Sequence, residues 1–275
     1  MGLMCENDFM PELVFLKLGG SLITDKTVPF TARKDKIASL AGIIARTLQT
    51  HPELSPVLGH GSGSFGHTAA EKNGTRQGVN SSEQWAGFAE VWYQASKLNR
   101  HVMDALHSAG IKAVALAPIS SITARDGRVI RWDLDPLRRA LDARILPVIY
   151  GDVVFDEVRG GTILSTEDLF GHLAHELHPK RILLAGLEEG VWADFPDRKL
   201  VVDRITPESF AGIKQRVGSG PGADVTGGME SKVGLMLEVV KANPVIKVLI
   251  FSGEAPENLQ KALNGEKIGT MISVT

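Results

Sequence analysis

Short, almost wholly apolar runs recur along this chain, and several of them lead directly into glycine. The run at 13–18 contains one charged residue, Lys17, and is followed at once by Gly19, Gly20 and Ser21. Continuous apolar runs of this length are typical of strands that are buried on both faces of a parallel sheet. Further strands are expected at 56–58, 112–117, 145–150, 181–184 and 245–251.

Helical patterns separate these runs. Apolar residues recur every three or four positions over 33–50 and over 82–109, where Gly110 is a typical helix end. The segment 165–168 has the capping chemistry of a helix start. Other elements are expected as short helices at about 135–143 and 230–242, hairpins at about 129–132 and 155–161, and loops over 71–81 and 196–220. Strands alternating with helices predict an α/β protein with a parallel-rich sheet that is covered on both faces.

The composition excludes several classes of protein. Its 275 residues include 43% hydrophobic and 23% charged residues, and the net charge of −2 gives no basic field for nucleic acid or an anionic membrane. No apolar run reaches the length of a transmembrane helix, and the first dozen residues lack the pattern of a secretory signal. The single cysteine, Cys5, excludes a disulfide framework. A cytoplasmic protein of one domain is expected.

The segment 60–67, His-Gly-Ser-Gly-Ser-Phe-Gly-His, predicts a phosphate site. It follows an expected strand, and a strand that runs into a Gly/Ser loop leaves backbone N–H groups free to converge on an anion. Two histidines bracket the loop, and it contains no acidic residue.

Three other interpretations of this loop stay open. It matches a P-loop except that His67 stands where the lysine is required, and it matches the Gly-x-Gly-x-x-Gly of dinucleotide sites. A dinucleotide site needs a second strand that ends in an acid, whereas 82–109 has the pattern of a helix. The third interpretation is a glycine-rich turn without a ligand.

Separate cations and one carboxylate are the candidates for phosphate chemistry. Lys17 is expected at the carboxyl end of its strand, where open α/β sheets bind ligands, and Lys26 can fold back over the same place. Asp152 follows Gly151 after the run 145–150, either at this site or as a turn cap. Lys232 is expected in the first turn of a helix, where a bound anion would offset its unfavourable interaction with the helix dipole.

Two groups of residues admit a structural or a functional interpretation. His172, His175 and His178 lack the H-E-x-x-H pattern, and on a helix the first and last point about 240° apart, so no metal site is expected. The aromatic residues of 82–109 fit a helix core, but they can also form the wall of an apolar pocket for a substrate tail. The candidates for that wall are Trp85, Phe88 and Trp92.

Three motifs together resemble the amino acid kinase family. They are Lys-x-Gly-Gly-Ser at 17–21, Gly-x-Gly-Ser-Phe-Gly-His at 61–67 and Asp-Val-Thr-Gly-Gly-Met-x-x-Lys at 224–232. The Ser-Phe-Gly-His ending and the lysine nine residues after Lys17 resemble the isopentenyl phosphate kinases of that family most closely. The resemblance covers about 12–275. It implies a three-layer αβα sandwich, an N-lobe over about 12–180 for the acceptor, a C-lobe over about 181–275 for ATP, and a homodimer.

The resemblance also implies roles for particular residues. Those expected to contact the transferring phosphoryl group are Lys17, Gly19, Gly20 and Ser21. Lys26 is expected to stabilise the transition state. Those expected to hold the acceptor phosphate are Gly61, Ser62, Gly66 and His67, with Gly151 beside them. Asp152 is expected to orient the lysines. The residues expected to contact the nucleotide are Gly186, in the turn 186–192, Gly227 and Lys232.

The implied reaction transfers a phosphoryl group from ATP, with Mg²⁺ carried by the nucleotide, to isopentenyl phosphate. A phosphate monoester is largely dianionic at neutral pH, so this acceptor needs no catalytic base, and none is visible among the motifs. Two rivals stay open. One is a kinase of the same fold that acts on a phosphonate or a carboxylate, and the other is a non-catalytic nucleotide-binding regulator.

Overall fold

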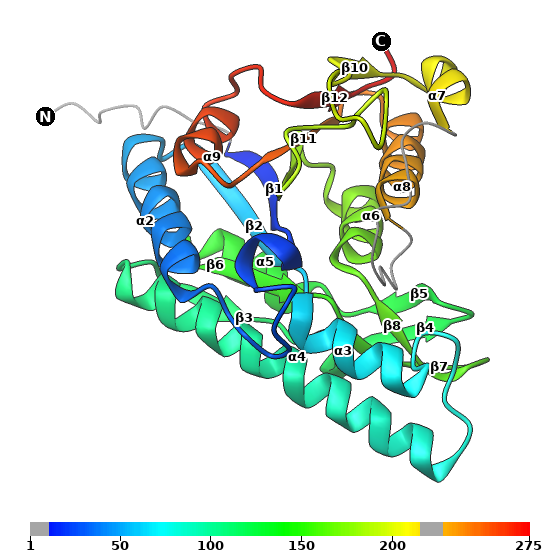
Figure 1. Ribbon diagram of the computed structural model, residues 1–275. Coiled ribbons are helices and arrows are strands. Elements are labelled where there is room, and N and C mark those ends of the chain that lie inside the picture. The colour runs from blue at the N-terminus through cyan, green and yellow to red at the C-terminus, as the bar shows by residue number, and fades with distance from the viewer. Residues whose placement is uncertain (1–10, 215–227) are drawn as a thin grey trace, which may run out of the picture.

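The computed structural model describes residues 11–214 and 228–275, and Gly227 therefore lies outside the described residues. An eight-stranded sheet runs through the molecule in the order β10-β12-β11-β9-β1-β2-β6-β3 (Figure 1). Its strands are β1 Glu12–Leu18, β2 Leu54–His60, β3 Ala113–Ala115, β6 Leu146–Tyr150, β9 Arg181–Gly186, β10 Arg204–Ile205, β11 Lys247–Ser252 and β12 Thr270–Ile272. Every neighbouring pair is parallel except β11 with β12.

The order of the strands divides this sheet at residue 181. The strands before that residue, β1, β2, β6 and β3, occupy one side, and the strands after it, β9, β11, β12 and β10, occupy the other. The boundary falls between β1 and β9, so the carboxyl end of β1, with Lys17, lies between the two halves. Lys17 is opposite Gly59 on one neighbour and Leu184 on the other.

Helices cover both faces of the sheet and make the expected three-layer αβα sandwich (Figure 1). Alternate residues of β1 enter different layers, because successive side chains of a strand point to opposite faces. Val14 and Leu16 pack in a core with α2 Lys34–Thr50, α4 Ser82–Ser108 and α9 Pro256–Leu263. Phe15 packs in the other core with α5 Asp135–Asp142, α6 Thr166–Leu177 and α8 Gly228–Ala242.

A second, four-stranded sheet lies beside α3 and α4. Its order is β5-β4-β7-β8, from β4 Ile122–Arg125, β5 Arg128–Trp132, β7 Asp152–Asp156 and β8 Gly160–Leu164. Both expected hairpins belong to it. A small apolar core that includes Phe88 and Val153 joins this sheet to α3 Gly63–Asn73 and α4.

Several boundaries differ from the sequence-based expectations. Helix α3 extends into the expected loop 71–81, and the expected loop 196–220 contains β10 and a short helix, α7 Pro207–Ile213. That helix begins with a capping box in which Thr206 and Ser209 bond each other's backbone. Helix α9 and strand β12 were not expected. Within the described residues, no helix combines the length and the apolar character needed to cross a membrane.

Candidate active site

The two glycine turns at the carboxyl ends of β1 and β2 pack backbone to backbone. A Cβ atom on Gly61 would lie 2.7 Å from the Gly20 nitrogen, and one on Gly20 would clash with the backbone of Gly63. Gly63 has a left-handed φ of 49°, which favours glycine. These glycines therefore allow the two turns to approach each other at the carboxyl ends of the two strands.

Both turns lead into helices. Gly20 and Ser21 begin α1 Gly20–Ile23, and Gly63 begins α3. The first N–H groups of a helix have no acceptor within that helix, so they are suited to an anion. The expected glycine loop 60–67 is therefore the last residue of β2, a two-residue turn and the start of α3.

Lys17 forms a buried ion pair with Glu167. Its Nζ donates to Glu167 Oε1 at 2.5 Å, and the two side chains are 9% and 11% exposed. Burial by itself raises the pKa of Glu167, but the charges of Lys17 and Lys232 hold that pKa below its usual value. The carboxylate therefore stays ionised and fixes the Lys17 ammonium between the two halves of the sheet.

Lys232 reaches the same carboxylate from another helix. Its Nζ lies 3.9 Å from Glu167 Oε1, so both ammonium groups lie within 4 Å of one oxygen. Lys232 is the fifth residue of α8 and thus lies in its second turn, not in the first turn as expected. The nearby Glu167 carboxylate stabilises the Lys232 ammonium group. The unfavourable interaction of Lys232 with the helix dipole therefore does not by itself require a bound anion.

Asp152, expected to orient the lysines, contacts none of them within the described residues. Its Oδ1 accepts a hydrogen bond from the Val153 N–H at 2.9 Å, and its Oδ2 has no partner there. Burial raises the pKa of Asp152 to about 8. Asp152 begins β7 of the smaller sheet, and the carboxylate that contacts Lys17 and Lys232 is that of Glu167.

Glu167 was missed because its local signal is that of a helix start. Ser165 and Asp168 form a capping box, in which the Ser165 hydroxyl accepts from the Asp168 N–H. This pattern explains Ser165 and Asp168 but assigns no role to Glu167, one of the two residues between them. The sequence carries no separate signal for Glu167, because its burial, which calls for a cationic partner, is known only from the structure.

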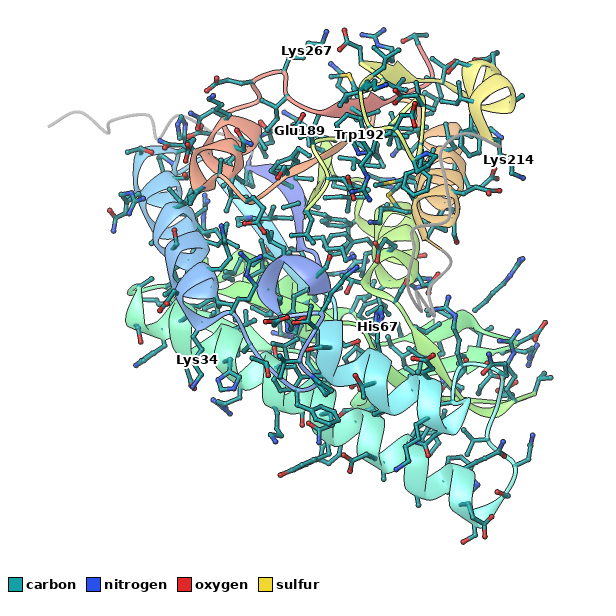
Figure 2. All side chains as sticks on the ribbon, viewed as in Figure 1. Lys34, His67, Glu189, Trp192, Lys214 and Lys267 are labelled. Carbon is teal, nitrogen blue, oxygen red and sulfur yellow. The ribbon has the colours of Figure 1, made fainter. Side chains whose placement is uncertain are left out.

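The two histidines of the glycine segment have different environments. His60 is fully buried, its Nε2 lies 3.2 Å from Asn99 Oδ1, and its ring stacks on Tyr150. Burial lowers the pKa of His60, so the ring is neutral and part of the core. His67 lies on α3, below α6 in the view of Figure 2, and is partly exposed. Only His67 is accessible to a ligand.

The structure places the remaining expected residues around the same edge of the sheet. Lys26 lies on the exposed loop between α1 and α2. Ser62 packs closely over Gly66, where any Cβ atom would clash with the Ser62 side chain. Gly151 joins β6 to β7, and its N–H donates to the His60 carbonyl. Gly186 ends β9, and a Cβ atom there would meet nothing within 4 Å, so the end of this strand is open.

The candidate aromatic wall is only partly supported by the structure. Phe88 is buried against Gly161, whereas Trp85 and Trp92 are 38% and 40% exposed on α4. His172 stacks on Trp132, and His178 lies 3.1 Å from the Asn243 side chain, so these histidines have different neighbours. No group of three or more metal-ligating side chains is present within residues 11–214 and 228–275.

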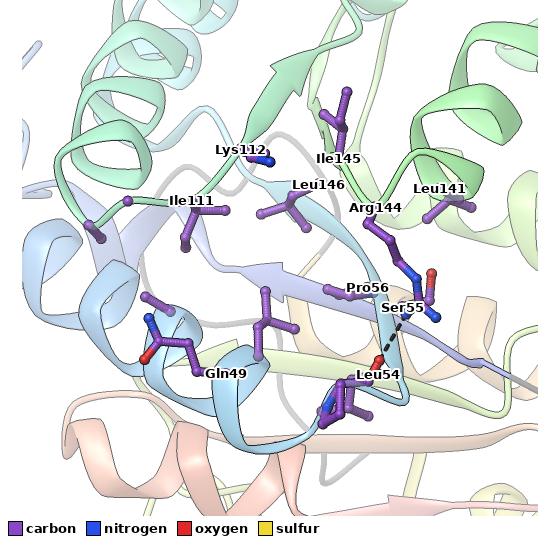
Figure 3. Close-up of a pocket in the computed structure, with 15 residues that line it drawn as sticks. Gln49, Leu54, Ser55, Pro56, Ile111, Lys112, Leu141, Arg144, Ile145 and Leu146 are labelled. Carbon is purple, nitrogen blue, oxygen red and sulfur yellow. Dashed lines mark hydrogen bonds between the residues drawn. The ribbon is translucent and has the colours of Figure 1, made fainter. Parts of the chain in front are cut away.

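A hollow of about 450 Å³ lies at the opposite end of the strands (Figure 3). Leu54 of β2 and Leu146 of β6 line it, together with the ends of α2 and α4. Arg144 at its rim donates to the Pro52 carbonyl at 2.8 Å. This hollow contains none of the candidate site residues.

Comparison with known proteins identifies the family. A model of the amino acid kinase family matches residues 12–252. The chain belongs to the amino acid kinase family. The resemblance inferred from the three motifs is thereby confirmed, and the P-loop and dinucleotide-fold alternatives are wrong. The helix α4, which stands where a dinucleotide fold needs its second strand, agrees with this result.

Relatives that match nearly the whole chain are isopentenyl phosphate kinases. That of Methanocaldococcus jannaschii is 32% identical over 269 residues, which cover 94% of this chain and 98% of that protein. That of Methanothermobacter thermautotrophicus is 33% identical over 276 residues, which cover 95% and 99%. An X-ray structure of isopentenyl phosphate kinase matches with a TM-score of 0.79 at 29% identity, covering 95% of this chain and 100% of that one.

Proposed function

We propose that this protein transfers the terminal phosphoryl group of ATP to isopentenyl phosphate, giving isopentenyl diphosphate and ADP. The observation that carries the reaction class is the Lys17–Glu167 pair, with Lys232 beside it, at the edge where two glycine turns meet. The acceptor is inferred from relatives named isopentenyl phosphate kinase, which match nearly the whole chain.

Lys17 and Lys232 neutralise the charge that develops on the transferring group. Phosphoryl transfer depends mainly on alignment and electrostatic stabilisation, and ammonium groups already fixed in place need little reorganisation. Glu167 supplies that fixation for Lys17 at 2.5 Å. Lys26 adds a third cation from the exposed loop, and the N–H groups of Gly20, Ser21 and Gly63 add hydrogen-bond donors.

The acceptor phosphate binds at Gly61, Ser62, Gly66 and His67. His67 donates to one of its oxygens, and Gly151 leaves room beside the β2–α3 turn. Because this phosphate is itself the nucleophile, no side chain has to remove a proton. Asp152, whose buried carboxyl contacts no lysine in the described chain, serves the structure rather than the reaction.

ATP binds over the half of the sheet that follows residue 181, and the acceptor binds over the preceding half. The open end of β9 at Gly186 and the position of Lys232 support this assignment. Mg²⁺ travels with the nucleotide phosphates, because Glu167 is already engaged by two lysines. A cytoplasmic location is part of the proposal, and a single cysteine in 275 residues supports a reducing compartment.

A homodimer is also part of the proposal. Strand β3 pairs only with β6 among the described residues, so its second edge is open, and Val114 on it is exposed. Size-exclusion chromatography with light scattering tests this directly. We expect about twice the chain mass of 29.6 kDa, whereas the mass of one chain would contradict the dimer.

ADP release in the presence of isopentenyl phosphate, UMP, glutamate or a phosphonate tests the acceptor. We expect the highest kcat/KM with isopentenyl phosphate. Preferred turnover of the phosphonate or glutamate would favour the rival kinase, and no turnover together with ATP binding would favour a non-catalytic regulator. A Lys17→Ala variant controls for contaminating ATPase activity.

A further inference from the structure

Glu254 ties the loop that carries Lys26 to the nucleotide half of the sheet. Its carboxylate accepts two hydrogen bonds from Arg33, from Nη1 at 2.5 Å and from Nη2 at 3.1 Å. Lys36 Nζ lies 3.1 Å from the second carboxylate oxygen and donates to the Glu254 carbonyl at 2.5 Å. A two-point bond between guanidinium and carboxylate fixes orientation as well as distance.

Arg33 closes one end of the Lys26 loop. Its N–H donates to the Ile23 carbonyl at 2.9 Å, and its guanidinium donates to the Leu22 carbonyl at 3.1 Å. A β-bridge between Thr24 and Ala32 brings the two ends of the loop together. The exposed segment with Lys26 is therefore held at a narrow base, and Arg33 is part of that base.

The other side of this base contacts the acceptor turn. The Ser64 N–H at the start of α3 donates to the Thr24 hydroxyl at 3.0 Å. The same hydroxyl donates to the Gly20 carbonyl at 2.7 Å. The base of the loop is thus bonded to both glycine turns.

Glu254 is in turn bonded to the expected nucleotide turn. The Gly253 N–H donates to the Gly186 carbonyl at 2.8 Å, and the Ser252 hydroxyl donates to the Leu187 carbonyl at 3.1 Å. The same hydroxyl accepts from the Glu254 N–H at 3.2 Å. A continuous set of bonds therefore runs from Gly186 through Glu254 and Arg33 to the loop.

Glu254 stays ionised over the physiological pH range, so its ion pair with Arg33 persists. Hydrogen bonds from Arg33, followed by those from Lys36, lower the pKa of Glu254 to about 2, although partial burial opposes this shift. The pair is one-third exposed or more, so it contributes little to global stability. Its geometric effect on the loop can therefore be separated from an effect on folding.

We propose that Glu254 is a positioning residue for phosphoryl transfer: through Arg33 it holds the Lys26 loop in register with the nucleotide turn. This proposal rests on the proposed function, because it takes Lys26 to contact the transferring group. It assigns Glu254 no contact with either substrate. Its effect therefore has to pass through Lys26.

A double-mutant cycle on kcat tests this dependence. We expect Glu254→Gln to lower kcat about 10-fold, since small displacements of a catalytic group are costly, with KM for the acceptor changed less than about 2-fold. In a Lys26→Met background the same substitution should change the residual kcat less than about 2-fold. Equal and multiplicative losses in both backgrounds, or an unchanged kcat for Glu254→Gln, would overturn the proposal.

Glu12→Gln is the matched control. It removes another arginine–carboxylate pair, in which Arg181 Nε lies 2.6 Å from Glu12 Oε1 at the opposite end of the sheet. We expect this variant to retain the wild-type kcat. A loss equal to that of Glu254→Gln would mean that any broken pair of this kind slows the enzyme, and the proposal would fall.

Hydrogen exchange separates failure of the tie from failure of the proposed function. If the wild-type protein does not turn over isopentenyl phosphate, the proposed acceptor is wrong, but the tie can still be measured without a substrate. Amides of 24–33 should exchange faster in Glu254→Gln than in wild type or in Glu12→Gln. Unchanged exchange in this segment would overturn the tie itself.

Discussion

The two ends of the same strands differ in chemistry. At the carboxyl ends of β1 and β2, Lys17 is buried beside Glu167 and glycine backbones touch. At the amino ends of β2 and β6, Leu54 and Leu146 line an apolar hollow with no buried ion pair among its lining residues. The hollow has a volume of about 450 Å³, yet it is the Lys17–Glu167 end of the strands that has the features of phosphate chemistry.

The direction of the helices explains this difference. Helices α3 and α6 begin at the end of the strands that carries Lys17 and Glu167, so their first N–H groups and positive dipole ends favour an anion there. Helices α2, α4 and α5 end beside the hollow, where their carbonyl groups favour cations such as Lys112 and Arg144. The volume of a cavity therefore does not indicate which ligand binds there. The direction of the surrounding helices and the buried charges indicate whether the site favours anions or cations.

The largest expected effect on kcat comes from Lys17, at the carboxyl end of β1. Lys17→Ala should lower kcat about 10³-fold, because in the proposed reaction it removes a preorganised cation that stabilises the transition state. KM for ATP should change much less. Steady-state kinetics with both substrates varied measures the two parameters. A change confined to KM would make Lys17 a binding residue only.

The next effect tests the carboxylate that holds the lysines. Glu167→Gln should lower kcat about 10²-fold, because Lys17 loses its fixed partner while the surrounding structure persists. It should also reduce the free energy of unfolding, since two cations lose a buried counter-charge. Both quantities are measurable on one preparation. Full activity of Glu167→Gln would mean that Glu167 is not needed to position Lys17 for the reaction.

His67→Ala should raise KM for the acceptor about 10-fold, the cost of one charge-assisted or neutral hydrogen bond to phosphate. The N–H groups of the glycine turns remain, so the KM for ATP should stay within about 2-fold. Equal increases in both KM values would make His67 a structural residue of α3 rather than part of the acceptor site.

Asp152→Asn should change stability more than activity. Burial raises the pKa of Asp152 to about 8, so the folded state keeps a proton that the unfolded chain releases near its ordinary value of 3.8. This contribution to stability is present below that ordinary value and is lost as the pH rises toward 8. Relative to wild type, the variant should gain up to about 1.4 kcal/mol per pH unit between pH 5 and 8.

Urea unfolding at several pH values measures that slope. The difference between the two proteins should level off above the folded-state pKa of about 8. A constant difference across this range would mean that Asp152 is ionised in the folded protein. A kcat loss as large as that of Glu167→Gln would give Asp152 a part in the reaction.

The smallest effect is expected at the apolar end. Lys112→Ala should reduce the free energy of unfolding by less than about 1 kcal/mol, because an exposed cation near a helix end contributes little. The kcat should stay within about 2-fold of the wild-type value. A large kcat loss at this distance would contradict the difference drawn between the two ends.

The sequence alone determined the features that depend on near neighbours. The period of apolar residues predicted β1, α2, α4 and β6, because a strand or helix needs a regular face that can be buried. The glycine and lysine motifs predicted the family, and the segment 165–168 predicted the start of α6. Each of these signals lies within a few turns or one strand.

The tertiary structure decided what distant segments do together. Lys17 and Glu167 are 150 positions apart, and only packing of α6 against the sheet brings their atoms to 2.5 Å. Asp152 and Glu167 are both buried acids, but they differ in their neighbours. Burial raises the pKa of Asp152, whereas the charges of Lys17 and Lys232 lower the pKa of Glu167. The exposure of Trp85 and Trp92 follows from which face of α4 meets the core. Such choices depend on the sum of long-range contacts, which no local pattern contains.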